Sequence, residues 1–216
     1  MFSLPVRYEN MREIPYPYKS MLAISSDAEY TSQEILDWLI TYLNTTENTA
    51  LGRGLGLEFA ASLFFYSDNP CHTSMYEGLS ADSKETQYAH KLREYIKEGL
   101  IDTNHAYGDF NVENNFTRSH ALRVYEMLEK YNLQIPIFTN HGNGSMDSMQ
   151  HNVGFLSHHF GSDPASLFYH TDLFRQRGGK FVWTDDWVYE KFPYLSLNKG
   201  NILCDDGRQP AGGGGF

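Results

Sequence analysis

Short apolar runs alternate along the chain with stretches whose apolar residues recur at helical spacing. The apolar runs predict buried strands over residues 21–25, 55–66, 100–103, 134–138, 167–169, 180–183 and 202–204. The helical spacing predicts helices over residues 32–43, 83–98 and 117–131. Residues 67–79 are expected to form a loop. Strands alternating with helices are typical of parallel strands joined by helical crossovers. We therefore predict an α/β fold, a distorted or incomplete (β/α) barrel of about six to seven parallel strands.

The predicted strands and helices lie in one part of the chain. Residues 1–19, rich in proline and tyrosine, are expected to form an irregular N-terminal segment. Residues 20–206 are expected to form a single barrel domain of catalytic type, which suits a chain of 216 residues. Residues 207–216 are expected to be a flexible glycine-rich tail.

Composition excludes several partners. The net charge of −10 and the absence of a basic run argue against binding to nucleic acid. The longest apolar run, residues 59–66, is too short to span a bilayer, and the first twenty residues do not resemble a signal peptide. We expect a soluble protein, with the cytoplasm favoured, and leave its oligomeric state open. Cys71 and Cys204 match no metal or redox spacing.

Polar side chains follow the predicted strands directly. These outlets read SSDAE, TNHAYGD, TNHGN, YHTD, WTDD and CDD. In (β/α) barrels the reactive groups gather where the carboxyl ends of the strands lead into loops. The repeated pattern therefore predicts a binding or catalytic edge. The sequence contains no P-loop, dinucleotide-binding, HExxH or GxSxG motif.

The outlet after residues 100–103 contains His105 and Asp109, four positions apart in a segment that cannot stay extended past Gly108. A loop that curls back would point an imidazole and a carboxylate at the same spot, as a small divalent cation requires. Alternatively, Asn104 and Asp109 cap backbone N–H groups of a turn, and His105 is a polar surface residue. Both interpretations stay open from these residues alone.

Two further outlets carry candidate acid and base groups. Asp27 and Glu29 occupy alternate positions, so both point to the same side of an extended strand end. One carboxylate can bind a metal while the other acts as a base; alternatively, Ser26 and Asp27 cap the following helix. His141, followed by Gly142, suits a general acid, a metal ligand or a substrate hydrogen-bonding group, or else it is a polar loop residue.

Other polar and aromatic residues of the outlets are candidates for contact with substrate. His170 and Asp172 can form an oriented imidazole–carboxylate pair. The full set of expected substrate-binding residues is Asn104, Tyr107, Asn140, His170 and Trp183.

The ordered set SSDAE, TNHAYGDF and FTNHG resembles the polysaccharide deacetylase superfamily, of the chitooligosaccharide deacetylase type. In that family the first strand ends in an Asp-Asp pair, of which the first Asp is the base and the second a metal ligand. A later His-Ser/Thr-x-x-His motif supplies two more ligands. By this resemblance Asp27 is the base, His105 is the first ligand histidine, and Asp109 stands at the position of the second.

The chain departs from the family pattern and is thus expected to be a divergent member. Ala28 occupies the position of the metal-binding Asp, so Glu29 or Asp27 would have to take its place. Asp109 in place of histidine makes the site more anionic. The family's Arg-Pro-Pro-Tyr segment is absent.

The resemblance implies a metal-dependent hydrolase that removes acyl (acetyl) groups from a carbohydrate. A divalent ion, zinc by analogy, would be held by His105, Asp109 and Glu29, with Asp27 as catalytic base and His141 as catalytic acid. One alternative is a glycoside hydrolase that uses two carboxylates. Another is a non-catalytic barrel with a degenerate metal site that binds a polysaccharide through Trp183, Trp187 and nearby tyrosines.

Overall fold

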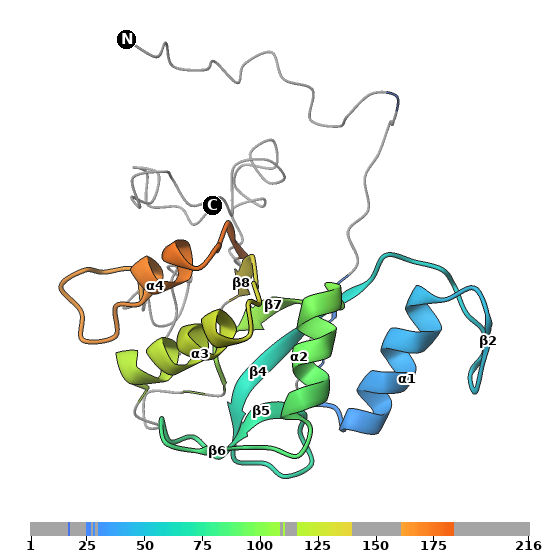
Figure 1. The fold of residues 1–216 in the computed structure, drawn as a ribbon, viewed down its shortest axis with the longest axis horizontal. Helices are drawn as coiled ribbons and strands as arrows, with labels where there is room; N and C mark the ends of the chain where they lie inside the picture. The colour runs from blue at the N-terminus through green and yellow to red at the C-terminus, as the bar shows by residue number, and fades with distance from the viewer. Residues whose placement is uncertain are drawn as a thin grey trace, which may run out of the picture.

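One mostly parallel sheet of seven strands forms the centre of the protein (Figure 1). The computed structural model describes residues 17, 25–26, 28, 30–108, 110, 116–139 and 161–183. The strands of this sheet are β1 (Ser25–Ser26), β4 (Ala60–Ser67), β5 (Ser74–Glu77), β6 (Lys84–Glu85), β7 (Ile101–His105), β8 (Ile137–Thr139) and β9 (Phe181–Trp183). Only β6 pairs antiparallel, with β5. The predicted α/β class with a largely parallel sheet is confirmed.

Strand β4 is the centre of the sheet. Residues 61–67 are all buried, as expected of a strand covered on both faces. Strand β7 pairs with one edge of β4, while β1 and β5 share the other edge, through Ser26 opposite Ala61 and Tyr76 opposite Tyr66. Strand β8 then pairs with β7, and β9 with β8. Strands β1, β4, β7, β8 and β9 therefore cross the sheet in the order in which the chain visits them.

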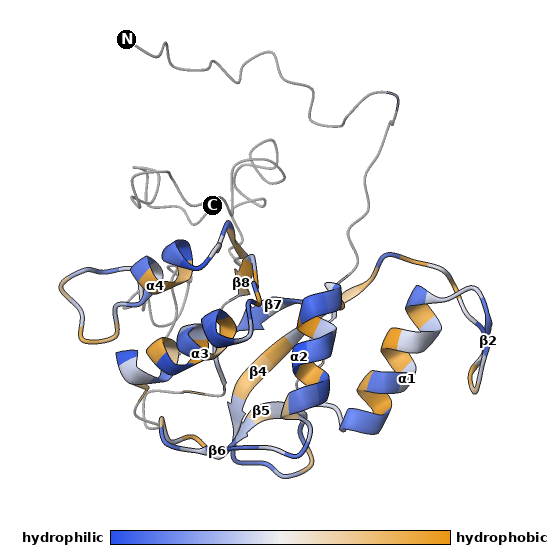
Figure 2. Ribbon diagram, viewed as in Figure 1, coloured by the Kyte–Doolittle hydropathy of each residue, from blue (hydrophilic) through white to orange (hydrophobic). Residues whose placement is uncertain are grey.

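Four helices and a small hairpin complete the described part of the chain. They are α1 (Gln33–Asn44), α2 (Ala89–Glu98), α3 (Arg118–Lys130), α4 (Thr171–Gln176) and the hairpin of β2 (Asn48–Thr49) with β3 (Gly52–Arg53). Helix α2 packs against β7 and β5, and α3 packs against α4. Figure 2 shows that β4 is strongly hydrophobic and that the helices alternate between hydrophobic and hydrophilic residues, as amphipathic helices on a buried sheet do.

The helix ends follow local capping chemistry. Ser32 begins α1, and its hydroxyl accepts a hydrogen bond from the Ile35 N–H (3.4 Å). Thr117 begins α3, and its N–H donates to Nδ1 of His120 (3.0 Å) in a capping box. Gly99 ends α2 in the left-handed conformation that glycine favours (φ 75°). The predicted starts of α1 and α3 and the stop at Gly99 are confirmed.

Two predictions fail around β5. The expected loop over residues 67–79 contains β5, which pairs parallel with β4. The expected helix over residues 83–98 begins only at Ala89, because residues 84–85 pair with β5 as β6. The Thr86 N–H then donates to the Met75 carbonyl and holds the chain extended for one more residue.

The strand expected over residues 167–169 is wrong. The Ser166 N–H donates to the Asp163 carbonyl and the Tyr169 N–H to the Ser166 carbonyl, so the chain forms turns there. Leu167 is 86 % exposed and has no core to face. The strand expected over residues 202–204 lies outside the described residues.

The structure bears on three further predictions, which concern the barrel, the domain limits and membrane-spanning helices. Within the described residues the sheet ends at β6 on one side and at β9 on the other, so the structure does not show a closed barrel. The predicted N-terminal segment, apart from Pro17, and the predicted tail lie outside the described residues, and the domain limits stay predictions. The longest helix in the described ranges, α3 with 13 residues, is shorter than the about 20 residues that cross a bilayer, and none of these helices could span a membrane.

Packing of α2 against the sheet gives a stability prediction. Leu92, fully buried on α2, fills space against the core. We expect Leu92→Ala to lower the free energy of unfolding by about 2–5 kcal/mol through lost burial and the cavity that it leaves. Leu122→Ala on α3, where the side chain is 42 % exposed, is the matched control and should cost less than about 1 kcal/mol. Urea unfolding followed by circular dichroism measures both, and equal losses would contradict this packing.

Candidate functional site

The carboxyl ends of the parallel strands lie at one edge of the sheet. His105, the last residue of β7, pairs with Thr139 of β8, which pairs with Trp183 of β9. These three strand ends are therefore level. Asn140 and His141 follow Thr139 directly in the sequence, so the chain leaves β8 toward them at the same level as His105.

The chain leaving β1 also runs toward His105. Ser26 pairs with Ala61 of β4, and Ala61 pairs on its other side with Ile101 of β7, four residues before His105. The Tyr30 ring then lies 5.8 Å from the Phe64 ring, which lies 5.2 Å from the His105 ring. The segment that contains Asp27 and Glu29 thus begins at Ser26 and ends one aromatic ring away from His105.

His105 is 5 % exposed, and the chain turns sharply after it. Ala106 and Tyr107 have φ angles of 49° and 53°, in the left-handed region, which costs side chains other than glycine about 1–2 kcal/mol each. A Cβ at Gly108 would meet the Tyr66 carbonyl oxygen at 2.5 Å, so only glycine allows this close approach to β4. Gly108 pairs parallel with Tyr66, so after the turn the chain continues along β4 and does not curl back within the described residues. Convergence of His105 with Asp109, which lies outside the described residues, stays a prediction. Backbone strain of this kind concentrates at functional sites.

Asn104 and Tyr107 hold this turn from the inside. Oδ1 of Asn104 accepts a hydrogen bond from the Tyr107 N–H (3.1 Å). The Tyr107 hydroxyl donates to the Tyr125 hydroxyl (2.8 Å), and both Asn104 and Tyr107 are buried. The Asn104 part of the alternative is therefore confirmed, whereas His105, which that alternative made a polar surface residue, is buried. Contact of Asn104 and Tyr107 with a substrate stays a prediction.

His170 lies in an aromatic cage below this turn. Its ring centroid is 5.0 Å from that of Tyr107, 5.5 Å from that of Phe116 and 5.7 Å from that of Phe138. Its Nδ1–H donates to the Phe168 carbonyl (2.9 Å), and Nε2 has no hydrogen-bond partner among the described residues. Complete burial lowers the pKa of His170 to about 4, so the ring is neutral at pH 7.

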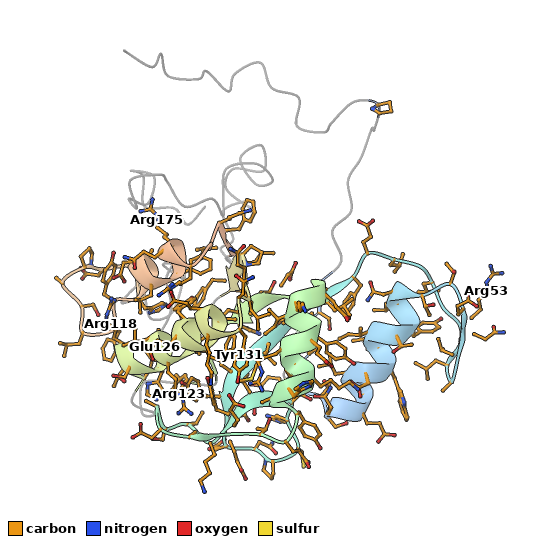
Figure 3. The ribbon with its side chains drawn as sticks, in the orientation of Figure 1. Arg53, Arg118, Arg123, Glu126, Tyr131 and Arg175 are labelled. Carbon is orange, nitrogen blue, oxygen red and sulfur yellow. The ribbon has the colours of Figure 1, made fainter. Side chains whose placement is uncertain are left out.

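The structure corrects two expectations about His170. It precedes α4 rather than following a strand. Asp172, expected as its partner, instead accepts two hydrogen bonds from Arg118 (2.7 and 2.6 Å; Arg118 is labelled in Figure 3). This bidentate ion pair links the start of α3 to α4. It also holds the pKa of Asp172 below its usual range. Substrate contact by His170 stays a prediction.

The other site residues expected from the sequence lie outside the described residues. They are Asp27, Glu29, Asp109, Asn140 and His141. The backbone of Trp183 ends β9, but its side chain is also outside what the structure describes. Among the described side chains, no three His, Cys, Asp or Glu residues are close enough to hold a metal ion. His105 is the one expected metal ligand whose position is known.

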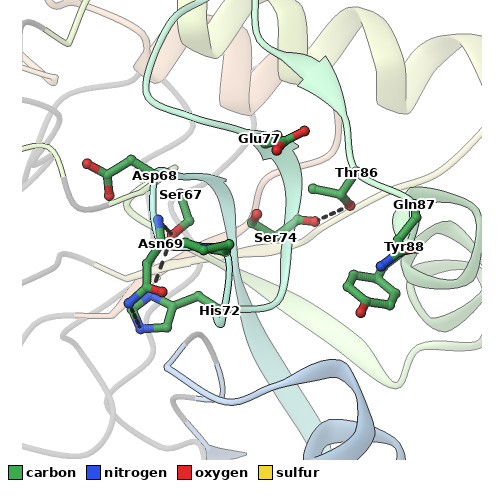
Figure 4. Close-up of a pocket in the computed structure, with 10 residues that line it drawn as sticks. Ser67, Asp68, Asn69, His72, Ser74, Glu77, Thr86, Gln87 and Tyr88 are labelled. Atoms are coloured by element: carbon green, nitrogen blue, oxygen red, sulfur yellow. Dashed lines mark hydrogen bonds between the residues drawn. The ribbon is translucent and has the colours of Figure 1, made fainter.

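A pocket of about 460 Å³ lies beside the β4–β5 connection (Figure 4). The loop of residues 67–72 forms one side, residues 86–88 form the other, and Ser74 and Glu77 of β5 lie between them. The His72 ring is 4.9 Å from that of Tyr30, so the pocket begins next to the aromatic rings that lead to His105. We name it the β5 pocket.

The sequence did not predict the β5 pocket, because residues 67–79 were expected to form a loop. A signal was present. The residues after the strand 55–66 read SDN, which is the same polar outlet that follows the other strands.

Burial of neutral His170 gives a pH prediction. In the unfolded chain this histidine has a pKa of 6.5, against about 4 in the folded protein. As the pH falls from 6.5 to 4, the unfolded state gains a proton that the folded state does not bind, so the free energy of unfolding falls, by up to about 3 kcal/mol.

His170→Gln should remove this part of the acid destabilisation. His90→Gln on α2, where the imidazole is 79 % exposed, should leave it unchanged. Urea unfolding at pH 7 and pH 5 measures the difference. If wild type and His170→Gln lose the same free energy of unfolding between pH 7 and pH 5, His170 does not cause the loss.

No family model matches this chain, and comparison with curated proteins and with solved structures also gives no match. Its function therefore has to be inferred from its own residues. The strongest features are the shared strand edge, buried His105 at that edge, and the strained turn that follows it.

Proposed function

We propose that the protein is a metal-dependent hydrolase of the polysaccharide deacetylase type, which removes acyl (acetyl) groups from a carbohydrate. The observation that carries this proposal is the parallel register of β7 with its neighbours. It puts His105 level with the end of β8, which His141 follows, and close to the segment between Ser26 and Tyr30. Groups from separate strands at one edge are what a barrel hydrolase requires.

The donor set fits a divalent cation. His105 would hold it together with the carboxylates of Asp109 and Glu29, and one imidazole with carboxylates suits zinc. His105 stands at the end of a central strand and is almost fully buried, so its position is rigid. A bound divalent ion polarises an acyl carbonyl and lowers the pKa of water in its coordination sphere.

The remaining residues of the edge have proton-transfer and positioning roles in this proposal. The Asp27 carboxylate accepts a proton from the attacking water, and the His141 imidazolium donates one to the sugar nitrogen or oxygen that leaves. The products are a carboxylate and a sugar amine or hydroxyl. Asn140 follows β8 in the sequence, and Trp183 is the last residue of β9. Both would orient the sugar in this proposal.

We also propose that the sheet is part of an incomplete (β/α) barrel. In a (β/α) barrel adjacent strands follow one another in the chain, whereas a doubly wound sheet reverses its order at a switch point. The strands β1, β4, β7, β8 and β9 lie in chain order across the sheet, which supports the barrel type, whereas β5 and β6 follow β4 on the side away from β7 and reverse that order. The short β5 shares an edge of β4 with β1, which supports a distorted rather than a regular barrel.

The first test is the metal content of the purified protein. We expect about one divalent ion per chain in the wild type and almost none in His105→Ala or Asp109→Ala, because a site with three protein ligands does not survive the loss of one. His90→Ala is the matched control, since this exposed histidine lies on α2. Full metal content in His105→Ala, measured by elemental analysis of folded protein, would remove the assignment.

The second test separates the base from the ligands. We expect Asp27→Asn to keep its metal and to lose turnover of an acetylated oligosaccharide by a factor of about 10²–10⁴. Asp82→Asn, at an exposed carboxylate of the loop before β6, is the control and should keep wild-type turnover. Loss of the metal in Asp27→Asn would make Asp27 a ligand instead.

A chelator distinguishes the deacetylase from a glycoside hydrolase. It should abolish deacetylation by the wild type, whereas hydrolysis of a glycosidic bond by two carboxylates needs no metal. Cleavage of glycosidic bonds that persists in the presence of a chelator would contradict the proposal.

A further inference from the structure

We propose that the β5 pocket binds one sugar residue that bears a free, protonated amino group. The choice of a sugar rests on the proposed function, because the residue would belong to the same glycan that the strand edge acts on. The volume of about 460 Å³ lies within the range of small-ligand sites.

A network of hydrogen bonds orients one wall of the pocket. The Cys71 N–H donates to Oδ1 of Asn69 (2.9 Å), which fixes the orientation of the Asn69 amide. The Asn69 Nδ2 then donates to Nε2 of His72 (2.9 Å). A neutral His72 therefore carries its proton on Nδ1, which faces the Ser67 hydroxyl at 3.4 Å.

This network makes Ser67 a donor toward the pocket. Its oxygen accepts from Nδ1–H of His72 and from the Asn69 N–H (3.2 Å). With both lone pairs used, the Ser67 hydroxyl proton is left for an acceptor on a ligand. Ser67 is therefore not activated as a nucleophile, since His72 donates to it rather than accepting its proton.

The β5 side of the pocket offers acceptors. The Ser74 hydroxyl donates to the Tyr76 carbonyl (3.0 Å), and the Thr86 hydroxyl donates to the Ser74 carbonyl (2.7 Å). Their protons are thus used within the protein, and each hydroxyl oxygen keeps a lone pair for a ligand donor. A sugar supplies such donors through its hydroxyl groups.

The charges of the lining favour a cation. Asp68 and Glu77 are exposed, and neither forms an ion pair with another described residue. No lysine or arginine is among the described residues that line the pocket. An ammonium group beside these carboxylates gains charge-assisted hydrogen bonds. The ring of Tyr88 lies across the pocket from the loop of residues 67–72 (Figure 4) and offers an apolar face to a sugar ring.

The position of the pocket connects it with the strand edge. Tyr30 contacts His72 at the pocket and Phe64 beneath His105. In this proposal a glycan whose acylated residue lies at the strand edge places a neighbouring residue in the β5 pocket. The protein would then prefer chains that already carry a free amino sugar.

Calorimetric titration with three oligosaccharides of equal length tests this inference. One carries free amino groups, one is fully N-acetylated, and one is neutral and carries only hydroxyl groups. We expect the free-amine oligosaccharide to bind wild type most tightly, and Glu77→Gln to weaken that binding about tenfold while the two other ligands change little. Glu98→Gln, at an exposed carboxylate at the end of α2, is the matched control and should bind as wild type does.

Further variants keep the test decisive. Ser67→Ala should weaken all three ligands, because its donor serves any sugar oxygen. Equal binding of the three ligands by wild type and Glu77→Gln, or no binding of any of them, would overturn the pocket assignment. Deacetylation by a protein with that result would leave the proposed function standing. Amine-selective binding that Glu77→Gln abolishes, without any metal-dependent deacetylation, would instead support the pocket and overturn the function.

Discussion

The parallel hydrogen bonding of β4 to strands on both of its edges determines most of this structure. Because residues 61–67 are buried, β4 needs a backbone partner at each edge, and β7 on one side and β1 with β5 on the other provide them. Parallel pairing makes every one of these strands leave the sheet at the same end. This constraint brings the ends of β7, β8 and β9 level at one edge of the sheet.

Packing below the edge makes its geometry rigid. The left-handed residues Ala106 and Tyr107 are held by Asn104, by the contact of Gly108 with β4 and by the aromatic cage around His170. A strained turn persists only where its surroundings determine it. The position of His105 therefore depends on core packing, and a change in the cage would move its side chain.

The sequence predicts those elements whose signals are local. Ser32, Thr117 and Gly99 mark helix ends through their own chemistry, and the long apolar run of β4 is unmistakable. Strand β5 could not be predicted, since its four residues become a strand only by pairing with β4. The β5 pocket was missed for the same reason. Gly108 did not predict the path after His105, because the chain there continues along β4 through pairing with Tyr66. The partner of Asp172 could not be predicted either, because Arg118 is 54 positions away.

The central claim is that side chains from separate strand exits surround one cation together with His105. X-ray absorption spectroscopy of the zinc-loaded protein tests it most directly. The account predicts nitrogen and oxygen ligands at about 2.0–2.2 Å with the scattering pattern of imidazole, and loss of that pattern in His105→Ala. A zinc spectrum that is identical in wild type and His105→Ala would contradict it.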